Sequence, residues 1–333
     1  MQLRITHETC YDYVPPVDIA QHVAYLQPLD TASQRLISHS LQVNPTPAQQ
    51  IASVDVYGNT RVFFSLQAAH TQLKVIARSL VSTHVTSQPD SALPWDQVRE
   101  RFRYCANKPF DAAAEFVFAS AYAPRHPEFG AYARPSFAPG VPLVTAARDL
   151  MQRIHNDFTY ESQSTQVNTP ALQALAQRKG VCQDFAHIMI ACLRAYGVPA
   201  RYVSGYLLTH PEPGQPRLIG SDASHAWVSV YLPDLPETRD TSGLCSSTRW
   251  WDFDPTNNRD GWCTPGEDYV TLALGRDYAD VSPIRGVIHG GANHVLTVGV
   301  TVEPYDVNQS QSQSSSQSQT QSQSQFQSMG AII

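Results

Sequence analysis

The sequence predicts an α+β protein, in which an N-terminal antiparallel β-sandwich precedes a unit of helices packed on an antiparallel sheet. Three observations support this prediction. Residues 1–85 alternate between apolar and polar residues in short runs, residues 95–305 show helical periodicity first and strand-like runs afterwards, and residues 308–328 are almost entirely Gln and Ser. Alternation with a period of two is typical of half-buried strands, and helices followed by strands are typical of the α+β class.

The first unit, residues 1–85, is expected to consist of strands. Within residues 54–66, Gly58 and Asn59 both tolerate a positive φ and therefore predict a hairpin turn. The expected strands cover residues 2–13, 38–45, 54–66 and 71–84. Residues 86–94 are rich in Pro, Ser and Asp and lose apolar periodicity, which indicates a linker. No cluster of reactive side chains is expected in this unit.

The second unit, residues 95–305, is expected to begin with helices and to end with strands. Helical periodicity covers residues 95–105 and 145–158, and the segment 168–180 begins at Thr169 as a helix N-cap and ends at Gly180. A further helix is expected from Cys182 to Tyr196, and it is apolar on nearly every face, as is typical of a helix surrounded by protein. The expected strands cover residues 200–208, 225–232, 249–255 and 294–304.

The C-terminal segment, residues 306–333, is expected to be a disordered tail. Its Gln and Ser residues provide too little apolar surface to offset the entropy of ordering the chain. Self-association through the Gln-rich tract is the alternative interpretation.

The bulk composition argues against several classes of protein. Hydrophobic residues make up 42% of the chain and charged residues 16%, which is ordinary for a globular protein. No apolar run approaches the roughly 20 residues that a membrane span needs, so no membrane partner is expected. A net charge of −6 without a basic stripe argues against nucleic acid as a partner. The first residues do not resemble a signal peptide, so we expect a cytoplasmic location.

The cysteines and histidines predict neither a disulfide framework nor a metal centre. The six cysteines are dispersed and form no CxxC pair, and the twelve histidines form no HExxH motif. We therefore expect no metal and no cofactor.

Cys182 stands where a cysteine can be reactive. In the first turn of the expected helix, unpaired backbone N–H groups and the helix dipole stabilise a negative charge. Such a position can lower the pKa of a thiol from about 8.5 towards neutrality. An ordinary cysteine in an apolar helix is a packing residue, and that is the expectation for Cys192. Cys182 is therefore the candidate nucleophile.

His225 and Asp254 are the candidate partners of Cys182. His225 begins one expected strand, and Asp254 ends the next strand before Pro255. Because antiparallel neighbours place the start of one strand near the end of the other, the two side chains can meet. A nucleophile, an imidazole and a carboxylate are what a catalytic triad requires. Taken singly, the His is more often a packed residue and the Asp a turn residue.

His187 is a weaker candidate for the base. On a helix it lies about 500° around the axis from Cys182, so the two side chains face different directions. We expect His187 to be a packing residue or a hydrogen-bonding support.

Three motifs in this order resemble those of the bacterial transglutaminase-like proteins, which belong to the papain-like superfamily. They are GVCQDFAH with the following GVPARYVSGYL, then SHAWVSVYLP, and then WWDFDPTNN. The resemblance implies a papain-like transglutaminase core, with Cys182 as nucleophile, His225 as base and Asp254 as the orienting acid. The segments RITHETCYDYVPPV and VDVYGNTRVFFSL are similar to the β-rich N-terminal domain that accompanies this core.

The resemblance implies a reaction through a thioester on the cysteine. We expect a cysteine protease or amidase acting on a peptide or amide, because water is abundant and needs no second binding groove. The alternatives are amine transfer to protein glutamine, as in a transglutaminase proper, and a non-catalytic peptide-binding scaffold. A peptide-forming or peptide-modifying partner enzyme is also implied. The backbone N–H of Cys182 at the helix N-terminus is the expected first donor to the oxyanion of the reaction. The second donor stays open among Gln166, Asn168 and Gln177, and the sequence encodes neither the substrate nor the oligomeric state.

Overall fold

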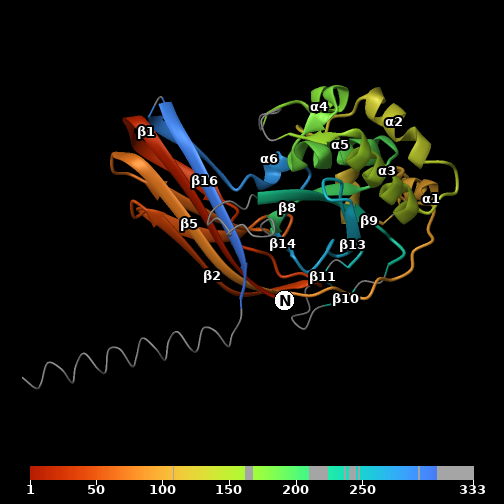
Figure 1. Ribbon diagram of the computed structural model, residues 1–333, viewed down its shortest axis with the longest axis horizontal. Coiled ribbons are helices and arrows are strands. Elements are labelled where there is room, and N and C mark those ends of the chain that lie inside the picture. The colour runs from red at the N-terminus through yellow and green to blue at the C-terminus, as the bar shows by residue number, and fades with distance from the viewer. Residues whose placement is uncertain are drawn as a thin grey trace, which may run out of the picture.

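The computed structural model describes residues 1–107, 109–161, 168–209, 224–235, 238–239, 245–246, 248–291 and 293–305. A β-rich part and a helix-rich part lie side by side, with helices packed on an antiparallel sheet in the second part (Figure 1). The predicted α+β class is confirmed. The expected tail, residues 306–333, lies outside the described residues.

The β-rich part is one curled antiparallel sheet of seven strands. These are β1 (Gln2–Ala24), β2 (Gln34–Asn44), β3 (Gln49–Val54), β4 (Thr60–Leu66), β5 (His70–Thr83), β15 (Ile284–Gly290) and β16 (Asn293–Pro304). The first half of β1 lies between β5 and β16, and its second half lies between β4 and β15. The register between β1 and β5 shifts between Asp12 and Val17, where Pro15 and Pro16 cannot donate ladder hydrogen bonds. A single bent strand therefore joins the two halves that the sequence predicts as a sandwich.

The two C-terminal strands of the described chain belong to this N-terminal sheet. The sequence predicts residues 294–304 as a strand of the second unit, whereas β16 pairs with β1 from Leu3↔Pro304 to Val14↔Asn293. Alternating apolar residues identify a strand, but its partner depends on tertiary packing that the pattern does not encode.

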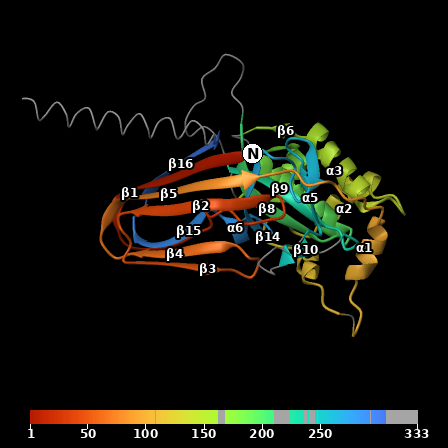
Figure 2. The same cartoon turned by 90° about the horizontal axis from the view of Figure 1, so that it is seen from below.

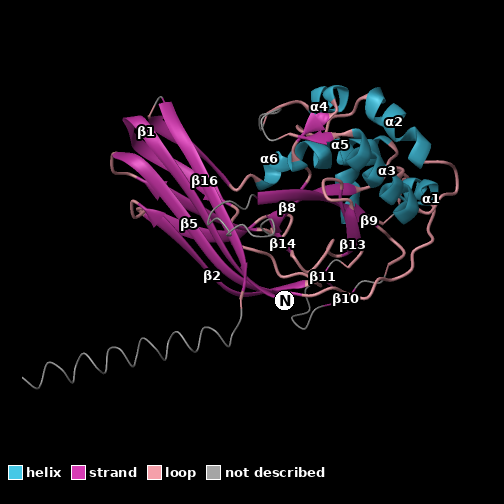
Figure 3. Ribbon diagram, in the orientation of Figure 1, coloured by secondary structure: helices cyan, strands magenta, loops and turns pink. Residues whose placement is uncertain are grey.

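The helices gather on one side of the second part (Figure 3). They are α1 (Trp95–Phe102), η1 (Ala112–Val117), α2 (Pro127–Ala133), η2 (Arg134–Ser136), α3 (Leu143–Asp157), α4 (Ala171–Gln177), α5 (Cys182–Ala195) and α6 (Tyr278–Val281). The expected helix from Cys182 is present as α5. Helix α4 begins after Pro170 rather than after Thr169, and it ends at Gln177 rather than near Gly180, because the C-cap Arg178 takes the left-handed conformation. Within the residues that the structure describes, none of the helices combines the length and the hydropathy of a membrane span.

A five-stranded antiparallel sheet supports these helices in the order β13-β12-β9-β8-β14. Its strands are β8 (Ala200–Leu207), β9 (Ser224–Tyr231), β12 (Trp250–Asp254), β13 (Arg259–Trp262) and β14 (Tyr269–Gly275). Helix α5 packs on β8 and β9. Four two-residue strands complete the described elements: β6 (Thr159–Tyr160), β7 (Lys179–Gly180), β10 (Thr238–Arg239) and β11 (Cys245–Ser246).

Two apolar cores connect the layers. One core lies between the helices and the five-stranded sheet, and it includes Cys192 and Phe253. The second fills the curled sheet and also takes Tyr206 and Val270 from the five-stranded sheet. Strands β8 and β14 accordingly lie between the curled sheet and the helices (Figure 2).

Gly205 lets β8 approach its neighbours closely. A Cβ atom at this position would overlap the backbone oxygen of Val270 and the ring of Trp227. Because neither the strand backbone nor a fully buried Trp can move away easily, Gly205→Ala is expected to lower the free energy of unfolding by about 3 kcal/mol. Urea denaturation measures this change.

Gly130→Ala is the matched control for that substitution. Gly130 lies in α2, and a Cβ there would be 3.7 Å from the Cβ of Ala195, an ordinary contact. We expect this change to leave stability the same or to raise it slightly, because Ala favours a helix over Gly. Equal denaturation midpoints for the two variants would contradict the packing described for Gly205.

Candidate active site

Cys182 is the first residue of α5, and the local sequence fixes its position. The preceding residue, Val181, is extended, and its N–H donates to the Asp184 carboxylate at 2.8 Å. A Cβ at Gly180 would be only 2.7 Å from an oxygen of that same carboxylate. Because Gly180 has no Cβ, the backbone can run close to the Asp184 carboxylate that accepts from Val181 at the start of the helix. Cys182 remains partly exposed at the positive end of the helix.

His225 and Asp254 meet as neighbours on two paired strands. Strands β9 and β12 are antiparallel with Val228 opposite Phe253, which brings the start of β9 to the end of β12. The Nε2 atom of His225 lies 2.7 Å from Oδ2 of Asp254. The His side chain is 10% exposed and the Asp side chain is fully buried, so this ion pair is shielded from water.

Cys182 completes the arrangement from the helix side. Its side chain hydrogen-bonds the His225 ring. Since Nε2 of that ring is engaged by Asp254, Nδ1 is the ring atom left for the sulfur. The structure thus brings together the three residues that the sequence selected, in the order thiol, imidazole, carboxylate.

The surroundings of His225 favour its charged form. Burial alone lowers the pKa of the imidazole, but the hydrogen bonds to Asp254 and Cys182 outweigh burial and raise the pKa to about 10. His225 is therefore an imidazolium at neutral pH.

Asp254 is held by more than its histidine. Its Oδ2 atom accepts from the Tyr269 hydroxyl and from the Asn257 side-chain amide, each at 2.7 Å. Its Oδ1 atom accepts from the backbone N–H groups of Thr256 at 2.8 Å and Asn257 at 3.3 Å. Burial raises the pKa of this carboxyl, but the hydrogen bonds from His225, Asn257 and Tyr269 lower it by more than burial raises it. The pKa of Asp254 is therefore below its ordinary value. The carboxylate stays ionised.

Sequence reasoning missed three residues of this site. Asn257 lies in the turn after Asp254, where an Asp-Pro turn signal could have suggested a bond to the carboxylate. Tyr269 comes from β14, on the far edge of the sheet, and no sequence signal connects it with Asp254. Tyr160 is paired in register with Gly180, and burial together with the nearby Cys182 raises the pKa of its phenol.

His187 and Cys192, for which packing or supporting roles are expected, are both buried. His187 is 2% exposed, accepts from the N–H of Tyr278 at 3.2 Å and stacks on Tyr122 and Tyr202. Burial lowers its pKa to about 3, so it is neutral and engaged. Cys192 is fully buried, and burial raises the pKa of its thiol.

The structure does not support any of the three candidates for the second oxyanion donor. Asn168 and Gln177 are exposed, and Gln166 lies outside the described residues.

Among the described residues, no three His, Cys, Asp or Glu side chains are grouped so that they could hold a metal ion.

Comparison with known proteins decides the family. Residues 131–255 match the transglutaminase-like superfamily, and residues 3–82 match the bacterial transglutaminase-like N-terminal region. An uncharacterized protein of Mycobacterium tuberculosis is 39% identical over 310 residues, which cover 91% of this chain and 93% of that protein. The chain belongs to the transglutaminase-like superfamily. An uncharacterized protein of Mycobacterium leprae is 30% identical over 307 residues, covering 90% of this chain and 98% of the relative.

A solved structure shows the same transglutaminase-like fold. The "putative cysteine protease" of Cytophaga hutchinsonii has a TM-score of 0.67 and 22% sequence identity, and the match covers 92% of this chain and 91% of the other. At this level of identity the likeness concerns the fold.

The raised pKa of His225 gives this transglutaminase-like protein a pH-dependent stability. Between the unfolded pKa of about 6.5 and the folded pKa of about 10, the native state binds a proton that the unfolded state has lost. This contribution is complete below about pH 6.5 and disappears as the pH rises through about 10. Urea denaturation at about pH 7 and about pH 9 should show a larger loss of stability for the wild type than for His225→Gln. Equal losses of stability in the two proteins would contradict the assignment of His225 as an imidazolium in the native state.

Proposed function

We propose that this protein is a thiol-dependent hydrolase that cleaves a peptide or amide bond through a thioester on Cys182. The observation that supports this most is the hydrogen-bonded line from the partly exposed Cys182 through His225 to the buried Asp254. A thiolate at a helix N-terminus beside an imidazolium is an activated nucleophile.

In the acylation half, the Cys182 sulfur attacks the carbonyl carbon of the substrate, and a C–S bond forms while the C=O electrons move to oxygen. His225 gives its Nδ1 proton to the substrate nitrogen, the C–N bond breaks, and an amine leaves. Asp254 holds the ring through Nε2 and stabilises its charged form. The products are a thioester on Cys182 and a neutral His225.

In the deacylation half, neutral His225 takes a proton from water as the water oxygen attacks the thioester carbon. The C–S bond breaks, the sulfur leaves as a thiolate beside the regenerated imidazolium, and a carboxylic acid is released. An amine in place of water would give a transferred amide by the same steps. Hydrolysis is favoured because water needs no second binding site.

The developing oxyanion needs donors that are already in place. We assign the backbone N–H of Cys182 as one of them, because the first N–H groups of a helix have no partner within the helix. Removal of one such donor typically costs about 10²- to 10³-fold in rate.

Trapping the acyl-enzyme tests this proposal. The full-length protein is incubated with peptides from a cell extract and quenched in acid, and the Cys182 peptide is weighed by mass spectrometry. We expect an acyl adduct that hydroxylamine removes, together with free carboxylic acid as the main product. Amide products in the presence of an added alkyl amine, in excess over acid, would instead indicate a transferase. No adduct and no turnover would leave the peptide-binding scaffold as the better description.

A further inference from the structure

Two neighbouring surface cavities lie at the end of the second part that is remote from Cys182. Their volumes are about 880 and 990 Å³, and Phe102, Arg103 and Phe118 line both. The first cavity reaches Tyr196 at the C-terminal end of α5. Cys182 is at the other end of this 14-residue helix, about 21 Å away along its axis. We call the two cavities with their shared wall the 102–118 groove.

The 102–118 groove carries an excess of positive charge. Among the described residues that line it, seven are arginines and three are Asp or Glu, although the chain as a whole has a net charge of −6. Arg99 and Arg103 share one carboxylate, Glu100, at 3.3 and 3.4 Å. Exposed pairs of this kind are weak, so they leave the arginines available to another anion.

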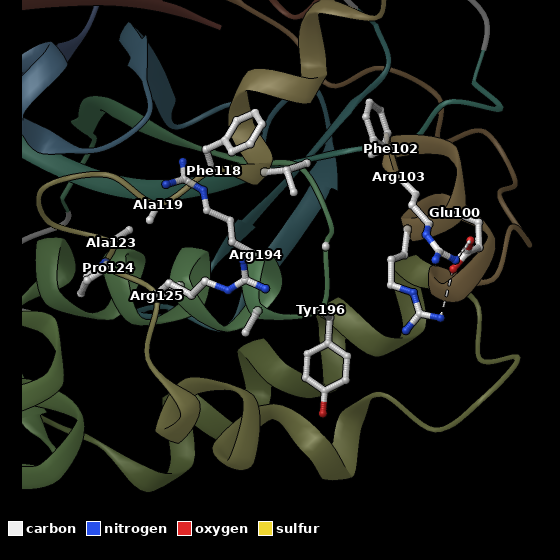
Figure 4. A pocket seen from close by; sticks show the side chains of 15 residues that line it. Glu100, Phe102, Arg103, Phe118, Ala119, Ala123, Pro124, Arg125, Arg194 and Tyr196 are labelled. Atoms are coloured by element: carbon white, nitrogen blue, oxygen red, sulfur yellow. Dashed lines mark hydrogen bonds and ion pairs between the residues drawn. The ribbon is translucent and has the colours of Figure 1, made fainter. Parts of the chain in front are cut away.

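Arg194 adds a buried charge to the first cavity. It is 7% exposed, and it donates hydrogen bonds to the hydroxyl of Ser120 and to backbone carbonyls, including those of Phe116 and Ala200. Figure 4 shows Arg194 and Arg125 on one side of this cavity and Glu100 and Arg103 on the other, with Phe118, Phe102 and Tyr196 around them. The cavity therefore combines cationic groups on facing walls with aromatic surface between them.

Aromatic side chains of the second cavity are exposed to water. Tyr104 is 92% exposed, Phe110 85% and Phe118 69%. Together with arginine, such aromatic residues are the types enriched where proteins bind one another. Their exposure beside a cavity of about 990 Å³ is typical of a binding surface rather than of a core.

We propose that the 102–118 groove binds an acidic peptide segment of another protein, with carboxylates on the arginines and apolar side chains on the aromatic rings. Two cavities that share a wall suit an extended segment better than a single small anion. The chain's negative net charge disfavours a long polyanion such as nucleic acid, whereas a short peptide brings only a few charges. This binding does not depend on the proposed chemistry at Cys182.

Fluorescence anisotropy with a labelled peptide of alternating Glu and Phe tests the proposal. The full-length Cys182→Ala protein is used, so that the peptide is not cleaved during the anisotropy measurement. The result is then independent of whether the proposed chemistry at Cys182 is correct. We expect saturable binding that weakens as salt is added. Arg103→Ala is expected to weaken binding about tenfold, since it removes charge-assisted hydrogen bonds. Phe118→Ala is expected to weaken peptide binding several-fold. Because Phe118 is exposed, a loss of binding in this variant would not be explained by misfolding.

Arg78→Ala is the matched control. Arg78 is exposed on β5 in the curled sheet, where it donates to Gln42, so its loss removes the same charge away from the groove. Binding should be unchanged in this variant. The proposal is wrong if the peptide fails to saturate, if Arg103→Ala behaves like Arg78→Ala, or if a Gln–Phe peptide binds equally well. Tighter binding of inorganic pyrophosphate or of a single-stranded oligonucleotide than of the peptide would also overturn it.

Discussion

Cys182→Ala is expected to abolish acyl-enzyme formation and to lower the rate of amide cleavage by roughly 10⁴- to 10⁶-fold. The proposed mechanism forms its covalent bond at this sulfur, and the alanine has no atom that can replace it. Because Cys182 is partly exposed at the helix terminus, the fold should tolerate the change. The measurement is kcat/KM on a peptide or amide identified by acyl-enzyme trapping.

Cys192→Ala provides the control within the same helix. Cys192 is fully buried in the core between helices and sheet, so its replacement is expected to cost stability while activity persists in the folded fraction. If Cys182→Ala retained cleavage, or if both variants lost it equally, the assignment of Cys182 as nucleophile would fail.

Asp254→Asn is expected to lower the cleavage rate by roughly 10³- to 10⁴-fold and to destabilise the fold by about 3 kcal/mol. The amide has nearly the same volume, but it loses the charge that raises the pKa of His225. The imidazolium then becomes less stable, and the ring loses the partner that orients Nε2. A pH–rate profile in which the alkaline limb moves to lower pH would show this effect.

Asp260→Asn separates this effect from the general loss of an ion-paired carboxylate in the same sheet. Asp260 lies on the adjacent strand β13 and forms an ion pair with Arg148 at 2.6 Å. Its substitution should change stability but not the pH–rate profile. If the Asp254 and Asp260 variants had the same profile, Asp254 would be a structural residue alone.

Much of the fold could be predicted from local patterns. The helix from Cys182 follows from its apolar residues and from Gly197 and Pro199 beyond its end, and α5 ends at Ala195. Strands β9 and β12 follow from β-branched and aromatic residues in short runs. What could not be predicted is the pairing of β16 with β1, because it joins segments about 290 residues apart through backbone bonds that any residue can make.

The site could be predicted only in part, for a related reason. His225 and Asp254 lie at or next to the ends of paired strands, so antiparallel pairing suggests that they meet, and the order of the motifs in transglutaminase-like proteins adds Cys182 at the start of α5. Tyr269 donates to Asp254 from a strand separated from β12 by β9 and β8 in the sheet order. Only the curvature and packing of the complete sheet bring that hydroxyl to the carboxylate, and no local pattern encodes them.

The alkylation rate of Cys182 tests the central claim most directly. Wild type and His225→Ala are treated with iodoacetamide at about pH 6, and modification of each cysteine is followed by mass spectrometry, with Cys192 as the internal reference. We expect rapid modification of Cys182 in the wild type, because the imidazolium stabilises the thiolate, and a large decrease in His225→Ala. A Cys182 that reacts no faster than Cys192, or equally fast in both proteins, would contradict the account.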